Sequence, residues 1–512
     1  MVEPVMTRES CCRNSWSSPA FRVALMVVLA VTVWRLFQLF GTPVNLSFDE
    51  AQYWSWSTDP AFGYFSKPPF IAWVIALTTG LGGDSEPWVR IGATLAHALT
   101  ALLVYGIGFV LFDRDHADAG SEHRSVGVWS GVIYITLPAV SLSSMLVSTD
   151  AFLLMFWALS LLGLACIVTG GSAWWWLAVG LGFGFGLLSK YAMVFFIVSV
   201  VLALLWHPPW RRFLRSPGLW GALVLGAALY APNIWWNLAH GMASYRHTGD
   251  NVNLGADVFN PLNMVAFLAS QAGVFGPLLL VTLVLALCVP ARSRLHVDWR
   301  FRFLAAFVVP VLVIMSVQAL VSRANANWAA PAFVAAVPLV VSWCLGTGAR
   351  AWILRASIVL HVLVASLVYN ADSLAAAFGV RVPPALDLQK RVRGWDDAGR
   401  WVRELKAQNP DRPLLFDDRK TMATLLYYAR PLAWDSFMWH PGDVVHNHYE
   451  LTMPLPDVPG GRFLYVTRHD PGVLYQRFQS VEPVAVFRSA GVAGGRLELS
   501  AWYVDHFLGY GP

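Results

Sequence analysis

The residue types best suited to chemistry lie in one short stretch near the N-terminus. Asp49 and Glu50 are adjacent carboxylates in a segment rich in tyrosine and tryptophan. A carboxylate partly removed from water beside aromatic rings binds its proton more tightly, which suits it to general-base work. Neighbouring carboxylates on a helix point about 100° apart, so only one can enter a shared cavity. We therefore predict Asp49 as the catalytic base and Glu50 as the residue that supports it.

A lysine follows this pair within the same stretch. Lys67 stands directly before Pro68 and Pro69, and two prolines hold a turn stiff. A stiffly held ammonium at the level of lipid headgroups is a good partner for a phosphate. The alternative interpretation is an aromatic belt whose charges snorkel to the membrane surface, as at many helix ends.

Polar residues of similar character recur further along the chain. Asp150 follows Ser148 and Thr149 and opens an apolar run, a position that fits a helix cap as well as a functional acid. We include it among the catalytic residues. Arginine is the better bidentate phosphate ligand, and two polar-aromatic clusters between later apolar runs contain one. The predicted substrate-binding residues are Lys67, Lys190, Tyr191, Arg246, Arg323 and Asn327.

The composition is that of a protein with many membrane spans. Of the 512 residues, 56% are hydrophobic and only 13% are charged, whereas soluble proteins carry about 25% charged residues. The net charge of +5 comes from short basic clusters between apolar runs, which fits orientation signals better than a nucleic-acid surface. The five cysteines have neither disulfide nor zinc spacing. We therefore expect membrane lipids, and no nucleic acid, around this chain.

The apolar runs predict a mainly α fold, a polytopic helical bundle of about 11–13 spans. The segment 68–87 is apolar for too few residues to span, so we expect a short interfacial helix there, within an outer loop 41–87. The predicted spans are 22–40, 89–112, 126–140, 150–169, 173–188, 190–206, 218–237, 263–290, 302–321, 329–346 and 351–370.

The distribution of lysine and arginine predicts the orientation of these spans, because both residues are retained on the cytoplasmic side. With the N-terminus inside, the basic clusters fall in one set of loops and the opposite set carries isolated positives only. An odd number of spans then places everything after about residue 371 outside, together with the candidate site residues. The clustered residues are Arg8, Arg13, Arg211, Arg212, Arg215, Arg292, Arg294, Arg300 and Arg350.

The chain changes character after about residue 371, where it gains charge and short strand-like runs. Such runs at 413–416, 462–466, 483–487 and 497–504, with helical patterns at 395–408 and 419–429, predict a small α/β domain. We therefore divide the chain into a transmembrane catalytic domain, 1–370, and an extracytoplasmic α/β domain, 371–512.

Three motifs are better explained without catalysis. One triplet has the DxD spacing that holds a metal and a nucleotide sugar, but it is common by chance in polar loops. Glycines inside an apolar run fit helix packing better than phosphate binding, and a His-Asn-His run lacks a second ligand group at metal spacing, which favours a surface loop. These motifs are Asp113-Arg114-Asp115, Gly182 with Gly184 and Gly186, and His446-Asn447-His448.

The stretches Phe48-Asp49-Glu50-Ala51-Gln52-Tyr53-Trp54 and Gly63-Tyr64-Phe65-Ser66-Lys67-Pro68-Pro69 resemble the first outer loop of the GT-C glycosyltransferases. The branch they resemble is the bacterial one related to aminoarabinose lipid A transferase and the protein O-mannosyltransferases. Weaker matches in the same order extend the resemblance over nearly the whole chain. They are Ser148-Thr149-Asp150, Gly186 to Tyr191, Pro232 to His240, Asn327 to Ala332, and Asp418-Arg419 leading into Leu425 to Tyr428.

The resemblance implies inverting transfer of a monosaccharide from a polyprenyl-phosphate donor, undecaprenyl phosphate in bacteria, to a lipid or glycan acceptor outside the cytoplasm. It implies a bacterial inner-membrane enzyme whose site faces the periplasm. Asp49 would be the catalytic carboxylate, Lys67 a donor-phosphate ligand, Asp150 a second acid, and Tyr64 a wall of the cavity. Ser66 stands where the aminoarabinose enzyme has an acidic residue implicated in metal binding, so we name no metal ligand and leave a divalent cofactor open.

Other classes of function stay open beside this one. A transporter or lipid flippase would need broken helices and polar residues near the bilayer midplane, whereas the polar residues here gather at one boundary. A membrane-anchored sensor would need fewer spans, and a cytoplasmic enzyme would use nucleotide sugars through Asp113 and Asp115. We favour the glycosyltransferase.

Overall fold

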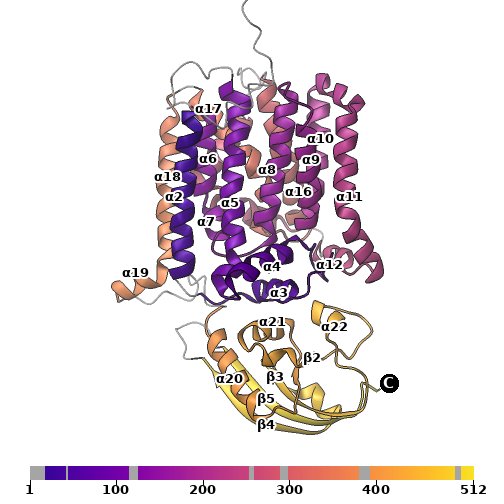
Figure 1. The fold of residues 1–512 in the computed structure, drawn as a ribbon. Helices are drawn as coiled ribbons and strands as arrows, with labels where there is room; N and C mark the ends of the chain where they lie inside the picture. Colours follow the sequence, from indigo (N-terminus) through magenta and orange to yellow (C-terminus); the bar gives the residue numbers. More distant parts are fainter. Residues whose placement is uncertain are drawn as a thin grey trace, which may run out of the picture.

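A computed structural model describes residues 18–41, 44–114, 125–252, 259–288, 298–346, 348–379, 392–489 and 497–511. Figure 1 shows a helical bundle above a small layer of strands and helices, with two short helices between them. The two short helices are α3 (Phe48–Ser57) and α4 (Phe70–Gly82). We call the end of the bundle that carries them the site end, and residues 392–489 and 497–511 the C-terminal α/β unit.

Within the described residues, seven helices are long and apolar enough to cross a membrane. They are α2 (Pro19–Gly41), α5 (Glu86–Gly108) with a π-helical extension (Phe109–Asp113), α8 (Thr149–Val168), α11 (Pro217–Ala239), α16 (Trp299–Val321), α17 (Ala330–Leu345) after the 3-10 turn Ala326–Ala329, and α18 (Ala351–Tyr369). The shorter elements are α6 (Val126–Thr136), α7 (Pro138–Ser143), α9 (Trp175–Ser189), α10 (Phe195–Trp206), α12 (Ala243–Val252), α13 (Pro261–Phe275), α14 (Pro277–Cys288) and α19 (Ala371–Ala377).

Each of the eleven predicted spans coincides with a helix or a pair of successive helices, which confirms a mainly α membrane bundle. One span differs in shape, because the run 263–290 is broken into α13 and α14, which are bent by 114°. Gly276 lies between them at φ 92, a conformation that favours glycine. The run predicted as one span therefore consists of two helices with a sharp bend between them.

The first and last spanning helices run in the same direction. The Trp34 ring in α2 packs at a tilt against the Tyr369 ring in α18, with ring centroids 4.7 Å apart, and Gln38 hydrogen-bonds Asn370 beyond the end of α18. Both helices therefore finish at the site end, as Figure 1 shows. If each of them crosses the membrane, the number of crossings between their starting and finishing sides is odd, in agreement with the predicted eleven.

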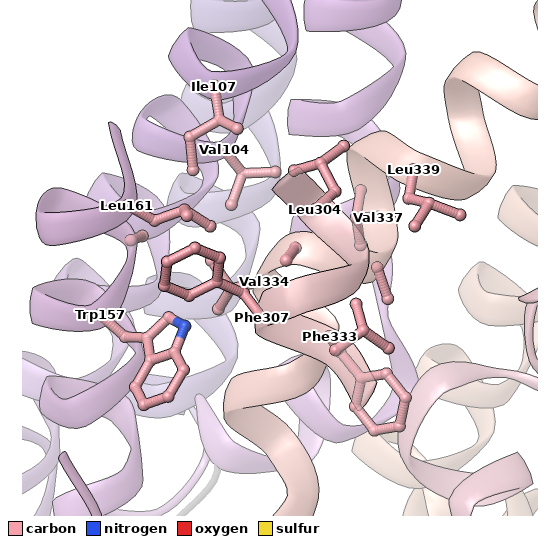
Figure 2. Packing of buried hydrophobic residues seen from close by; sticks show 14 of the residues in the cluster. Val104, Ile107, Trp157, Leu161, Leu304, Phe307, Phe333, Val334, Val337 and Leu339 are labelled. Atoms are coloured by element: carbon pink, nitrogen blue, oxygen red, sulfur yellow. The ribbon is translucent and has the colours of Figure 1, made fainter. Parts of the chain in front are cut away.

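The centre of the bundle is formed by α5, α8, α16 and α17 (Figure 2). Val104, Trp157, Phe307 and Val334 are fully buried there and come from these four helices. Lipid tails are as apolar as these side chains, so close packing rather than water exclusion holds such a core together. The site residues are thus anchored to a rigid frame.

The glycines of α9 serve this close packing. A Cβ on Gly182 would lie 2.8 Å from the Phe156 carbonyl oxygen, and one on Gly184 would lie 3.1 Å from the Gly226 Cα in α11. Because glycine has no Cβ, the neighbouring helices can approach α9 this closely. Packing therefore accounts for two of the three glycines, as the sequence indicated.

Asp113, from the discounted triplet, caps a helix. Its carboxylate accepts hydrogen bonds from the Val126 and Gly127 amides and from the Ser125 hydroxyl at the start of α6. Capping of this kind satisfies amides that have no partner within their helix. Asp115 of the triplet, and the predicted orientation residues Arg8, Arg13, Arg292 and Arg294, lie outside the described residues.

The C-terminal α/β unit holds a five-stranded sheet in the order β2-β1-β3-β5-β4. Its strands are β1 (Leu414–Phe416), β2 (Ser436–Met438), β3 (Gly460–Thr467), β4 (Phe478–Arg488) and β5 (Glu498–Phe507), and its helices are α20 (Trp395–Gln408), α21 (Arg419–Tyr428) and α22 (His448–Thr452). Strand β1 pairs in parallel with β2 and β3, and β5 pairs antiparallel with β3 and β4. The four predicted strands and two predicted helices are present, whereas β2 and α22 were missed.

Candidate active site

A cavity of about 740 Å³ opens at the site end, between the bundle and the C-terminal α/β unit. The first loop contributes one wall, the ends of α8, α10, α12 and α16 contribute others, and α21 closes it from the C-terminal side. The cavity thus gathers side chains from segments hundreds of residues apart. The predicted site residues among its lining are Asp49, Glu50, Lys67, Asp150, Lys190, Tyr191 and Asn327.

Helix α3 begins with a capping box that separates the two neighbouring carboxylates. The Ser47 hydroxyl accepts a hydrogen bond from the Glu50 amide, and Glu50 Oε2 accepts one from the Ser47 amide at 2.9 Å. Such reciprocal bonds turn the Glu50 side chain back over the helix start. Asp49 is left free to face the cavity.

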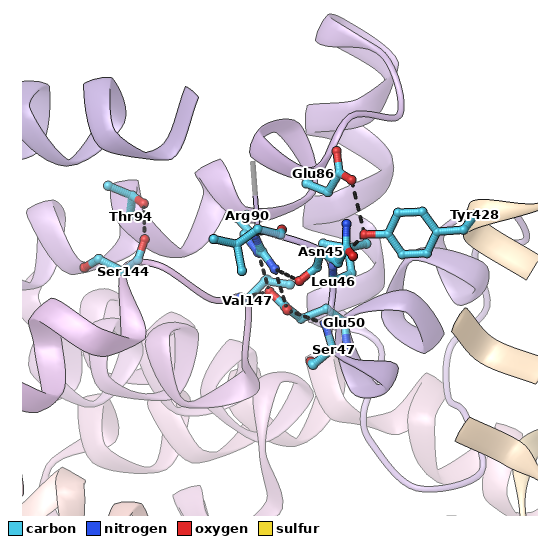
Figure 3. A network of polar contacts seen from close by, with 11 residues as sticks. Asn45, Leu46, Ser47, Glu50, Glu86, Arg90, Thr94, Ser144, Val147 and Tyr428 are labelled. Atoms are coloured by element: carbon cyan, nitrogen blue, oxygen red, sulfur yellow. Dashed lines mark hydrogen bonds and ion pairs between the residues drawn. The ribbon is translucent and has the colours of Figure 1, made fainter. Parts of the chain in front are cut away.

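The Glu50 carboxylate is held in a buried ion pair with Arg90 of α5 (Figure 3). Arg90 Nε and Nη2 donate to its two oxygens at 2.7 and 2.9 Å, and the Val147 amide donates at 2.9 Å. Burial alone would raise the pKa of Glu50, but the Arg90 charge and these hydrogen bonds hold the pKa below its ordinary value. The carboxylate is therefore charged and fully engaged, which fits a positioning role and no proton transfer.

Asp49 is the carboxylate that remains accessible. Half of its side chain is exposed, and its Oδ1 accepts a hydrogen bond at 3.2 Å from Arg419 Nη1, which comes from α21. The same Nη1 donates to the Gln52 side-chain oxygen. An accessible carboxylate oriented by an arginine can accept a proton from a bound hydroxyl.

The second predicted acid, Asp150, joins two predicted binding residues into one group. Its Oδ1 accepts a hydrogen bond from Lys190 Nζ at 2.7 Å, and its Oδ2 accepts one from the Asn327 amide at 2.9 Å. The side chains of Asp150 and Lys190 are mostly buried. Both carboxylate oxygens of Asp150 are thus occupied by hydrogen bonds, and Asp150 positions the Lys190 ammonium and the Asn327 side-chain amide.

Lys67 is the unpaired cation of this cavity. Its ammonium makes no hydrogen bond or ion pair with any part of the chain that the structure describes, although its backbone carbonyl accepts a bond from the Tyr64 amide at 3.1 Å. Burial lowers the pKa of Lys67, and the nearby Lys190 charge lowers it further. A half-buried cation without a partner is a site for an anion.

Tyr64 lies behind the cavity wall and does not line the cavity. Its ring stacks on Trp56 with centroids 4.6 Å apart, and its hydroxyl donates to the Trp56 carbonyl at 2.9 Å. Ser244 of α12 donates to the Tyr64 carbonyl. The tyrosine therefore stiffens the loop that carries Lys67, and the predicted place in the wall was wrong.

The remaining predicted ligands divide into two groups. Tyr191 lines the cavity and hydrogen-bonds Asn233 at 3.5 Å. Arg246 and Arg323 are both exposed and stand outside the lining. The structure therefore does not bring these two arginines to the cavity.

Several lining residues were not named as site residues from the sequence. Tyr53 follows Asp49 by one helical turn, and burial, with the nearby Asp49 charge, raises its pKa so that it stays a hydrogen-bond donor. Its spacing of four residues from Asp49 is a signal that the sequence contained. Arg419 was noted only as part of the Asp418-Arg419 match and not as a site residue, because only the fold brings residue 419 to residue 49.

The His-Asn-His run also reaches this region. His446 and Asn447 line the cavity, Asn447 caps α22, and the His448 ring packs edge-on against Trp56. Among the described residues, no three histidine, cysteine or acidic side chains are grouped so as to hold a metal ion. The run therefore helps to form the wall.

Comparison with known proteins places this chain in a class of membrane enzymes, the glycosyltransferases. The model of the dolichyl-phosphate-mannose-protein mannosyltransferase family matches residues 66–236. The lipid A galacturonosyltransferase RgtD of Rhizobium johnstonii is 34% identical over 454 residues, which cover 87% of this chain and 91% of that protein. An undecaprenyl phosphate-alpha-4-amino-4-deoxy-L-arabinose arabinosyl transferase of Pseudomonas fluorescens is 26% identical over 181 residues, 35% of this chain and 31% of its own.

The fold is that of ArnT from Cupriavidus metallidurans. Its crystal structure in the apo state matches with a TM-score of 0.56 at 17% identity, over 93% of this chain and 97% of that one. The structure bound to undecaprenyl phosphate matches with a TM-score of 0.54 at 16% identity, with the same coverage. The chain belongs to the GT-C glycosyltransferases related to ArnT, and it is a multi-pass membrane protein. The predicted family and enzyme class are confirmed.

Proposed function

We propose that this enzyme transfers a uronic acid sugar from undecaprenyl phosphate to lipid A, with inversion at the sugar. The names of its relatives support the sugar, the acceptor and the lipid carrier: RgtD is a lipid A galacturonosyltransferase, and another relative uses an undecaprenyl phosphate sugar. The observation that carries the mechanism is that accessible Asp49 and unpaired Lys67 open into one cavity. The proposed reaction needs one base and one phosphate ligand in that arrangement.

In the proposed step, Asp49 removes the proton from an acceptor hydroxyl as its oxygen attacks the anomeric carbon. The bond from that carbon to the phosphate oxygen breaks, and undecaprenyl phosphate leaves with the electron pair. Lys67 meets the charge that grows on this phosphate. Asp150 holds Lys190 and Asn327 toward the substrates, and Glu50 keeps the first loop in place through Arg90.

We further infer that residues 1–370 form the catalytic membrane domain and that residues 371–512 form a periplasmic domain of a bacterial inner-membrane protein. The cavity lies at the site end, and the C-terminal α/β unit lies beyond the same end (Figure 1). Basic residues Arg211, Arg212 and Arg215 follow α10, whose start lines the cavity at the site end. Their clustering at its other end fits a cytoplasmic face there.

The test uses the purified enzyme with undecaprenyl phosphate-linked galacturonic acid as donor, lipid A as acceptor, and mass spectrometry of the product. Asp49→Asn should lower transfer by about 10²- to 10⁴-fold, which is the range for losing a general base. Asp59→Asn is the matched control, because Asp59 is exposed and outside the cavity lining. Full activity in Asp49→Asn would remove Asp49 from the mechanism, and no transfer by the unmodified enzyme would refute the proposed substrates.

A further inference from the structure

Arg419 is the cation that the C-terminal α/β unit contributes to the cavity. It is the first residue of α21, whose capping residue Asp418 accepts a hydrogen bond from the Thr421 amide. Helix α21 packs against α3, so the guanidinium reaches Asp49 from a segment 370 residues away. Its side chain is about a quarter exposed, and it remains accessible from the cavity.

Only part of this guanidinium is engaged. Nη1 donates to Asp49 and to Gln52, and the guanidinium carbon lies 5.1 Å from the centre of the Phe48 ring. Within the described residues, Nε and Nη2 make no hydrogen bond. A guanidinium has five N–H donors in a rigid fork that fits a carboxylate. Arg419 therefore keeps donors for one further planar anion.

The two lysines of the cavity are less suited to this role than Arg419. Lys190 is paired with Asp150 at 2.7 Å, and Lys67 is unpaired and suits the donor phosphate. As the proposed base, Asp49 must contact the acceptor oxygen that attacks the anomeric carbon. A residue hydrogen-bonded to Asp49, as Arg419 is, therefore lies no further from that carbon than the width of one sugar ring. In a uronic acid, the carboxylate is attached to the ring carbon on the other side of the ring oxygen from the anomeric carbon. It therefore also lies within one ring width of the anomeric carbon, where Arg419 can contact it.

We propose that Arg419 selects the donor sugar by binding the carboxylate of a uronic acid through its free donors, while Nη1 stays on Asp49 and Gln52. This inference rests on the proposed function. A neutral hexose offers a single hydroxyl at that position, which leaves part of the fork unpaired, and an amino sugar brings a like charge. Both effects discriminate against the wrong donor.

The experiment compares two donors that differ only in this group, undecaprenyl phosphate-linked galacturonic acid and undecaprenyl phosphate-linked galactose. The ratio of their kcat/KM values is measured for the unmodified enzyme, Arg419→Met and Arg419→Lys. Hydrogen bonds between charged partners predict a fall in that ratio of about 10- to 100-fold in Arg419→Met. Arg419→Lys keeps the charge but loses the fork, so its ratio should lie between the two.

The ratio isolates recognition of the sugar, because Arg419 also touches the proposed base. Any misplacement of Asp49 slows both donors equally and cancels. Where galactose is not transferred at a measurable rate, the ratio of the inhibition constants of the two lipids is compared among the same variants, which reports discrimination in binding. Lys420→Met is the control, since Lys420 is the next cation on α21, lies over the Phe48 ring and is not part of the lining.

The possible failures are separate. If the unmodified enzyme transfers galacturonic acid and Arg419→Met slows or weakens both donors by the same factor, selection by Arg419 is refuted while the proposed function stands. If the unmodified enzyme transfers neither sugar, the proposed function itself fails. An unchanged ratio with unchanged rates would also exclude Arg419 from donor recognition.

Discussion

Replacing Glu50 by glutamine tests whether this carboxylate acts through structure or through chemistry. Glu50 is 1% exposed and Arg90 is 3% exposed. Glutamine keeps the shape of the side chain but removes its charge, so Arg90 would remain buried with its charge uncompensated (Figure 3). Losing one partner of a buried ion pair costs about 3–5 kcal/mol.

Four hydrogen bonds set the size of this effect. Arg90 donates two of them, and the Ser47 and Val147 amides donate the others. A glutamine amide nitrogen cannot accept, so the donors facing it lose a partner. Each buried donor left unsatisfied costs about 1–3 kcal/mol, which overlaps the ion-pair figure and is not added to it. We expect destabilisation of at least about 3 kcal/mol.

The assay is thermal unfolding of the purified protein, monitored through the loss of its monodisperse peak in size-exclusion chromatography. Glu50→Gln should unfold several degrees below the unmodified protein, and adding Arg90→Met should restore part of the loss. Glu86→Gln is the control, because Glu86 accepts one hydrogen bond from Tyr428 and makes no ion pair within the described residues. The double variant separates the interaction energy of the Glu50–Arg90 pair from the effects of the two single substitutions.

The pH dependence gives a second readout. Because the pKa of Glu50 is lowered in the folded protein, its contribution to stability is complete above about pH 4.3, the ordinary glutamate value. It is lost as the pH falls through the lowered pKa. The difference in unfolding temperature between the unmodified protein and Glu50→Gln should therefore narrow in acid. Unchanged unfolding with a transfer rate reduced 100-fold or more (roughly the loss of a proton-transfer group) would refute the structural role.

Two further predictions concern the phosphate ligand and the bundle. Since burial lowers the pKa of Lys67, kcat/KM for the donor should decline at alkaline pH below the ordinary lysine value of about 10.4. In Lys67→Arg, kcat/KM should stay constant over that range. Identical pH profiles for the two proteins would exclude Lys67 as the titrating group. Gly184→Val should lower the unfolding temperature, because its Cβ would meet Leu229 at 2.7 Å, whereas Gly221→Ala should not, because no atom lies within 4 Å of that position; equal effects would exclude close packing as the cause.

The bundle could be predicted from the sequence because long apolar runs leave few alternatives in a membrane. The broken span was missed although Gly276 and Pro277 form a dipeptide that marks turns. Strand β2 has only three residues, too few for an alternating pattern to be recognised. Hydropathy therefore located the helices, and the errors arose where local backbone chemistry overrides it.

The individual residues of the site could be predicted from the sequence better than the hydrogen bonds between them. Asp49 and Lys67 carried local signals, since a carboxylate and a cation among aromatic residues are costly unless used. The bonds from Lys190 to Asp150 and from Arg419 to Asp49 join residues 40 and 370 positions apart. No local pattern determines such pairs, because they depend on how whole helices pack. Arg246 and Arg323 show the converse, a suitable residue type that the packing leaves outside the cavity.

The division of roles between the two neighbouring carboxylates follows from Ser47. A serine at the start of a helix with a glutamate three residues later forms a capping box, and this sequence has that pair in Ser47 and Glu50. The box turns Glu50 back toward the helix start, where Arg90 meets it. Asp49 lies one residue earlier and thus about 100° away around the helix, and half of its side chain stays exposed at the cavity. The order serine, phenylalanine, aspartate, glutamate therefore decides which acid supports the loop and which one is free to accept a proton.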